Sequence, residues 1–176
     1  MRMINFPELR QFYEWDCGAS AVQSLLHYYG LDASGSELVE LIGTNKQGSS
    51  PVGLKKALKK YGLEYKAGKM TISEVKDCIK DKRPVIMLIQ AWPEKRVKAN
   101  NDWKNSWHNG HYVVAIGYDA KKIYFEDPYV SRRSFLYFSE LIDRWHDLGL
   151  DGKKYVNWGM VVFGKRNKHF APIHME

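Results

Sequence analysis

The chain has 176 residues, 44% of them apolar, which suits one domain over residues 1–176 and excludes a chain disordered throughout. The 27 basic residues outnumber the 20 acidic ones, for a net charge of +7, yet they are spread along the chain and form no nucleic-acid-reading motif, so no nucleic-acid partner is expected. No apolar run reaches the roughly 18 residues that cross a bilayer, and the start MRMINFPELR lacks the apolar core of a signal peptide. We therefore expect no transmembrane segment and a soluble, cytoplasmic protein.

The first half of the chain predicts helices. Apolar residues recur at helical spacing over 17–29, with Asp16 as the expected N-cap. Capping signals and helix-stopping glycines predict three further helices, over 36–42, 51–61 and 72–82.

The second half predicts mainly strands. Apolar runs of strand length, a short amphipathic helix containing Leu141 and Trp145, and a last strand follow one another. The expected strands cover 84–92, 111–119, 122–128, 132–138 and 155–165. Helices followed by strands indicate an α+β fold, in which a helical N-terminal half packs on a mainly antiparallel C-terminal sheet. The residues after Lys165 are expected to fray.

A long polar loop, 93–110, separates two of the predicted strands. Loops of this length in compact domains are usually functional or disordered. Trp103 and Trp107 lie in it, and indole rings are costly to leave in water. We predict a flap beside the functional site, with both tryptophans as candidate substrate walls; simple packing explains them equally well.

The two cysteines have different settings. Cys17 opens the first helix, where the helix dipole favours a thiolate, and is the candidate nucleophile. Cys78 lies on an apolar helical face and is interpreted as a core thiol. Two cysteines make neither a disulfide framework nor a zinc site, so we expect no metal or other cofactor.

A thiolate nucleophile needs a base and a group that orients it. His111 opens a buried strand directly after Gly110, a residue that lets backbone and substrate approach closely; His108 is the rival base. Asp127 shares a face with His111 if the hairpin register is right, whereas Glu126 points to the opposite face. The developing oxyanion also needs donors, which the amide of Gln11 and the backbone N–H of Cys17 supply if the intervening FYEWD segment folds back.

These motifs resemble a known family. "QFYEWDCGAS", "LLHYYG", "SSPVGLKKALKKYGLEY", "RPVIMLIQAW" and "GHYVVAIGYD…IYFEDP" are similar to the bacterial double-glycine peptidases, papain-like enzymes that process bacteriocins. The resemblance spans roughly residues 8–130 and implies a papain-like fold. It implies an oxyanion role for Gln11, a nucleophile at Cys17, a general base at His111 and an orienting role for Asp127.

The resemblance also implies partners. Many family members lie at the N-terminus of peptide-exporting transporters and cut leader peptides after Gly-Gly, so a peptide or protein substrate and association with a membrane export system are expected. Three functions remain open on the sequence. They are a cysteine peptidase, an acyltransferase or transpeptidase that uses the same residues, and a non-catalytic peptide-binding module.

Overall fold

The computed structural model describes residues 1–92, 102–130 and 132–165. Half of the predicted flap, residues 93–101, and the predicted frayed tail, residues 166–176, therefore lie outside the described residues. Within the described residues, no helix combines the length and the apolar character that crossing a membrane requires.

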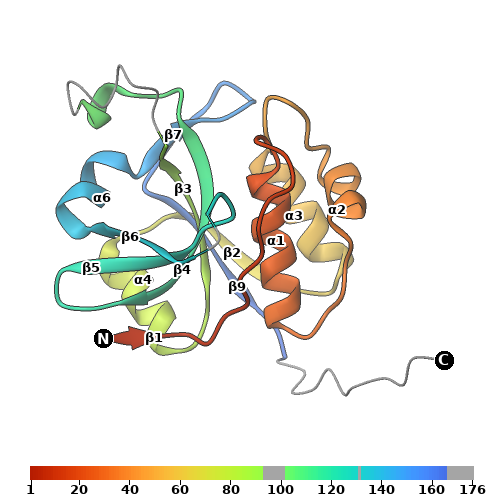
Figure 1. Ribbon diagram of the computed structural model, residues 1–176, viewed down its shortest axis with the longest axis horizontal. Coiled ribbons are helices and arrows are strands. Elements are labelled where there is room, and N and C mark those ends of the chain that lie inside the picture. Colours follow the sequence, from red (N-terminus) through yellow and green to blue (C-terminus); the bar gives the residue numbers. More distant parts are fainter. Residues whose placement is uncertain (93–101, 131, 166–176) are drawn as a thin grey trace.

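Three helices from the first half of the chain lie together. They are α1 (Cys17–Tyr28), α2 (Gly35–Ile42) and α3 (Pro51–Lys60). Figure 1 shows them grouped on one side of the molecule, with the strands and the helices α4 (Ile72–Lys80) and α6 (Phe138–Arg144) on the other. The capping signals that predicted the helices over 51–61 and 72–82 are confirmed, since the hydroxyls of Ser50 and Thr71 accept backbone N–H groups in the first turns of α3 and α4.

The main sheet is antiparallel throughout. Its order is β2-β9-β3-β4-β5-β6, and β1 also pairs with β4. The strands are β1 (Arg2–Met3), β2 (Glu64–Lys69), β3 (Val85–Gln90), β4 (Gly110–Tyr118), β5 (Lys122–Glu126), β6 (Ser134–Tyr137) and β9 (Trp158–Phe163). The predicted α+β class and the mainly antiparallel sheet are thus confirmed.

The division into a helical half and a strand half is too simple. β2 comes from the first half and pairs along its whole length with β9, although its charged sequence EYKAGK shows no apolar run. The predicted amphipathic helix, which contained Trp145, is longer than the observed helix α6. The observed helix ends at Arg144, because the next residues form β7 (His146–Leu148), which pairs with β8 (Lys154–Val156).

The hairpin of β4 and β5 sets the face on which the candidate residues lie. Ala115 pairs with Phe125 and Gly117 with Tyr124, so a bulge at Ile116 shifts the register by one residue. Beyond the bulge, the face of Ala115 and Phe125 is also the face of His111 and Asp127. The register that the sequence analysis required is therefore confirmed.

β4 is the central strand of the core. Its side chains from His111 to Gly117 are buried, and both α1 and α4 pack against it. The first turn of α1 carries Cys17 and the first residues of β4 carry His111, so this packing brings the start of the helix to the start of the strand.

Candidate active site

Cys17 is the first residue of α1 and is only 8% exposed. The N–H groups of this helical turn have no intrahelical partners, so their partial positive charge favours an anion at Cys17. Gly18 allows α1 to approach the loop before α3 closely, because a Cβ atom there would lie 2.6 Å from Ser49 Cβ. The start of α1 therefore packs closely against the loop containing Ser49, and the Cys17 thiol has little exposed surface.

Asp16 is the N-cap residue of α1, as predicted, but its side chain does not cap the helix. Its carboxylate accepts the backbone N–H groups of Phe12 (3.3 Å) and Tyr13 (3.1 Å) instead and makes no cap hydrogen bond to the helix. The carboxylate thus holds the turn between Gln11 and Cys17 in a folded shape. Burial raises the pKa of Asp16, against the hydrogen bonds from Tyr13 and Phe12, which lower it.

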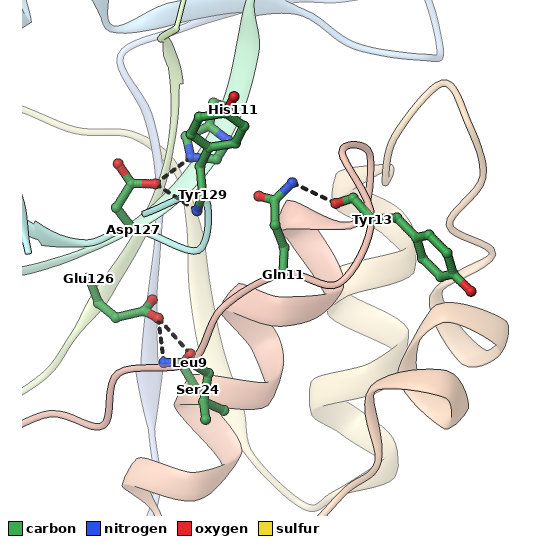
Figure 2. Close-up of polar contacts among 8 residues, drawn as sticks. All are labelled: Leu9, Gln11, Tyr13, Ser24, His111, Glu126, Asp127 and Tyr129. Carbon is green, nitrogen blue, oxygen red and sulfur yellow. Dashed lines mark hydrogen bonds and ion pairs between the residues drawn. The ribbon is translucent and has the colours of Figure 1, made fainter. Parts of the chain in front are cut away.

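His111 and Asp127 form a buried pair. The distance from His111 Nε2 to Asp127 Oδ1 is 2.8 Å, and the two residues are 6% and 4% exposed. The same Oδ1 atom accepts the backbone N–H of Tyr129 at 3.0 Å, which fixes the carboxylate (Figure 2). With Nε2 bound to Asp127, the imidazole has Nδ1 left for Cys17.

The pair is electrostatically coupled to the thiol. Burial alone would lower the pKa of His111, but hydrogen bonds with Asp127 and Cys17 and the charges of both partners raise it to about 10. Burial also acts to raise the pKa of Asp127, yet the bond to His111 holds it below its usual value. The arrangement favours an imidazolium at His111 and a carboxylate at Asp127.

Gln11 lies beside this pair, but its amide nitrogen is engaged elsewhere. The backbone N–H of Gln11 donates to Pro128 O at 2.8 Å, which ties it to the segment after Asp127. The side-chain Nε2 donates to Tyr13 O at 2.7 Å, while Oε1 is buried without a hydrogen-bond partner. In Figure 2 the amide nitrogen faces Tyr13 and the oxygen faces the His111 side. The side chain must turn before it can donate a hydrogen bond there.

A cavity of about 70 Å³ lies next to Cys17. It is bounded by the loop of Gly48 and Ser49 on one side and by Gly110 and Asp147 on the other. Burial raises the pKa of Asp147 to about 6, although Gln90 Nε2 donates to its Oδ1 at 2.7 Å. This cavity therefore offers a narrow cleft with one carboxyl group in its wall.

The other predicted site residues have mixed outcomes. Gly110, predicted to let a substrate approach, lines the cavity, but the space where its Cβ would stand is filled by the Asp147 carboxylate. The Trp103 ring lines a second cavity, and its centroid lies 3.9 Å from Arg144 Cζ. The Trp107 ring packs on the His146 ring.

Two alternatives considered for the site can be compared with the structure. His108, the rival base, is exposed, whereas His111 holds the carboxylate. Cys78 is half-buried against the core, and burial raises its pKa. Neither residue lies with the buried pair. Among the described residues, no group of three or more His, Cys, Asp or Glu side chains is placed to hold a metal ion.

Sequence analysis missed two polar residues near the site, Gln90 and Asp147, which are 0% and 9% exposed. Glu126, 2% exposed, lies on the face opposite to Asp127, as expected. Gln90 lies inside the apolar run predicted over 84–92 and is the last residue of β3, and Asp147 lies in β7, a strand that was not predicted. The one available signal was a polar residue inside an apolar stretch, because such groups are buried only when they are hydrogen-bonded or functional.

Residues 5–154 match the model of the peptidase C39 family. The chain belongs to the peptidase C39 family. Within this family, it is 30% identical over 118 residues to LagD of Lactococcus lactis subsp. lactis, a lactococcin-G-processing and transport ATP-binding protein. That match covers 65% of this chain but only 14% of LagD, so the C39 chain spans a small part of that relative's length.

Solved structures share the fold. A C39-like peptidase from Bacillus anthracis has a TM-score of 0.70 at 17% identity, covering 95% of this chain and 100% of that one. A double-glycine-motif protease from an AMS/PCAT transporter, solved with its leader peptide, has a TM-score of 0.64 at 20% identity, with coverages of 92% and 93%. The peptidase domain of Streptococcus ComA, a bifunctional ABC transporter, gives 0.62 at 20% identity, with coverages of 94% and 100%.

Proposed function

We propose that this C39 chain is a cysteine peptidase in which Cys17 is the nucleophile, His111 the general base and acid, and Asp127 the group that orients His111. The observation that carries the proposal is the buried pair of His111 and Asp127, whose free imidazole nitrogen serves Cys17 at the start of α1. Helix start and imidazolium both favour the thiolate, the form that attacks a carbonyl carbon.

In the proposed resting state the thiol proton already lies on His111, so that Cys17 and His111 form a thiolate–imidazolium pair. The thiolate attacks the carbonyl carbon of the scissile peptide bond, and the carbonyl oxygen takes up negative charge. His111 then gives its proton to the leaving amine as the C–N bond breaks, which leaves a thioester on Cys17. A water molecule gives a proton to His111 and attacks the thioester, and the acid product leaves as the thiolate–imidazolium pair is restored.

The oxyanion is stabilised by the backbone N–H of Cys17 and the side-chain amide of Gln11. For this role the Gln11 amide turns from Tyr13 O toward the site. This motion breaks the hydrogen bond from Gln11 Nε2 to Tyr13 O, which contributes about 1 kcal/mol. The unpartnered Oε1 supports such a motion, because the present orientation leaves one polar atom of the amide unsatisfied.

The proposed substrate is a peptide that enters the cleft beside Cys17 in an extended form. The cavity there is small, about 70 Å³, which supports a preference for small residues next to the scissile bond, such as the Gly-Gly of leader peptides. LagD combines processing with transport, which supports association with a membrane export system and a site on the cytoplasmic side.

The test is a peptide-library digest read by mass spectrometry, with the parent protein, Cys17→Ala and the matched control Cys78→Ala. The parent and the Cys78 variant cleave, and Cys17→Ala does not. A Cys17→Ala protein that cleaves as well as the parent refutes the proposal. Repeating the digest with an added amine separates hydrolysis from acyl transfer, since only a transferase joins the acyl group to that amine. A pure binding module cleaves nothing and retains its peptide.

A further inference from the structure

Glu126 is a buried carboxyl group that the proposed mechanism does not use. It is 2% exposed and lies next to Asp127 in the chain, but on the opposite face of β5. Its Oε1 accepts the hydroxyl of Ser24 at 2.9 Å and the backbone N–H of Leu9 at 3.2 Å (Figure 2). A carboxyl group this deeply buried needs a reason, because burial of such groups is costly.

The two donors come from the segments that carry the other proposed reacting groups. Leu9 stands two residues before Gln11, and Ser24 lies on α1, two helical turns after Cys17. Glu126 itself adjoins Asp127. The Glu126 side chain therefore joins three parts of the proposed site: the segment of Leu9 and Gln11, the helix α1 that carries Cys17, and the end of β5 next to Asp127.

The surroundings of Glu126 favour a neutral carboxyl group. Its Oε2 atom is buried and has no hydrogen-bond partner. Burial raises the pKa of Glu126 to about 8, although the bonds from Ser24 and Leu9 lower it. The charge of Asp127 adds to the rise, and the charge of His111 opposes it.

The remaining charged groups near Glu126 line a shared cavity of about 170 Å³. They are Glu8, Arg10, Arg132 and Arg133. Arg133 is engaged by Glu8 at 2.8 Å and by the carbonyl of Phe6 at 3.1 Å. α1 contributes the uncharged Ser24 to the contact with Glu126.

We propose that Glu126 is a positioning residue, whose neutral carboxyl group clamps the Leu9 segment and α1 to β5 and so holds Gln11 and Cys17 in place beside His111. This inference rests on the proposed function for its catalytic consequence, but the clamp itself does not. Glu126 touches no reacting atom and acts through the segments that it joins.

The clamp has a pH signature. In the closed arrangement, the Leu9 segment and α1 are both bound to Glu126, and the pKa of Glu126 is raised. This arrangement is therefore most stable when the pH is below 4.5, the ordinary pKa of a glutamate. As the pH rises from there toward 8, an open arrangement that hydrates the carboxylate gains about tenfold per pH unit. Above about 8, where Glu126 ionises in place, no further change is expected.

The first experiment reads the clamp without catalysis, in the Cys17→Ala background. Hydrogen exchange at the Leu9 amide is measured by NMR between pH 5.5 and 8 and corrected for its intrinsic pH dependence. Between pH 5.5 and 8, we expect protection of the Leu9 amide to fall at least about tenfold in the protein that retains Glu126. In Glu126→Gln, whose neutral amide keeps an oxygen acceptor, we expect it to fall less than twofold. The matched control Glu14→Gln, an exposed residue of the same segment, follows the parent. Equal pH dependence in the parent and in Glu126→Gln overturns the proposal.

The second experiment reads positioning in the active protein. Glu126→Ala is expected to lower kcat about tenfold or more with little change in KM, because oxyanion contacts act in the transition state. Ser24→Ala lowers kcat less, and Glu126→Gln restores it to near the parent value. An unchanged kcat in Glu126→Ala overturns the catalytic consequence. If the parent itself cleaves nothing, the proposed function fails, while the amide-exchange result still decides the clamp.

Discussion

Asp127 Oδ1 lies 2.8 Å from His111 Nε2 across a hairpin whose register is shifted by the bulge at Ile116. Without this extra residue, the alternation of side chains along β5 would turn Asp127 to the opposite face. The electrostatics of the candidate site therefore depend on one irregularity in the sheet. Four expectations follow from this geometry and from the cleft beside it.

Asp127→Asn removes the carboxylate that holds His111. Because the bond and charge of Asp127 raise the pKa of His111, the variant should lower that pKa by about one unit or more. NMR titration of the His111 ring in the parent and the variant measures the shift. The general-base activity should fall about 10²-fold or more. An unmoved imidazole pKa would show that Asp127 does not control the ring.

Gln11→Ala should lower kcat by about 10²–10³-fold and leave KM nearly unchanged, because the amide is proposed to bind the oxyanion and not the ground-state substrate. Steady-state kinetics on the best peptide of the library digest measure both constants. Gln47→Ala is the matched control, since Gln47 is an exposed glutamine on the rim of the same cleft. Equal losses in the two variants would argue against the oxyanion role.

Asp147→Asn should stabilise the fold near neutral pH. The pKa of Asp147 is raised to about 6 in the folded protein, so its contribution to stability is greatest below the ordinary value of 3.8 and declines as the pH rises toward 6. The asparagine keeps an oxygen that Gln90 can bind and removes the buried charge. Urea unfolding at pH 4 and pH 7 should show a gain of about 1–3 kcal/mol at pH 7 only. A gain of the same size at both pH values would contradict this account.

Gly110→Ala should destabilise the protein by about 1–3 kcal/mol, because its Cβ would overlap the Asp147 carboxylate. Asp147→Ala removes that obstacle. In the double variant the cost of the Gly110 change should largely vanish, which gives a coupling that urea unfolding of the four proteins measures. Simple additivity of the two changes would show that some other contact requires glycine at 110.

Much of the fold could be predicted from the sequence because its signals are local. Capping residues such as Thr71 mark the helix starts, and the apolar runs of β3 and β4 mark the buried strands. β2 was missed because an edge strand with one exposed face can be built from charged residues, and its pairing with β9 is a tertiary contact. The end of α6 was missed for the same reason, since β7 exists only through its pairing with β8.

The candidate site could be predicted in part. Strand alternation allowed His111 and Asp127 to share a face, but the bulge at Ile116 that makes them do so could not be predicted; the position of Cys17 followed from helix periodicity. The side-chain choices of Asp16 and Gln11 could not be predicted, because each has several backbone partners within reach and the folded turn decides among them. Asp147 joins the cleft from a segment that has no local signal of function.

The last strand of the sheet, β9, stands between β2 and β3. A nascent chain that ends before Trp158 leaves β2 without a partner and β3 with β4 as its sole neighbour in the main sheet. Residues 158–163 must therefore meet strands formed about 70 to 100 residues earlier in the chain before the sheet is continuous. During synthesis, the sheet beside Cys17 is thus incomplete until Phe163 has emerged from the ribosome.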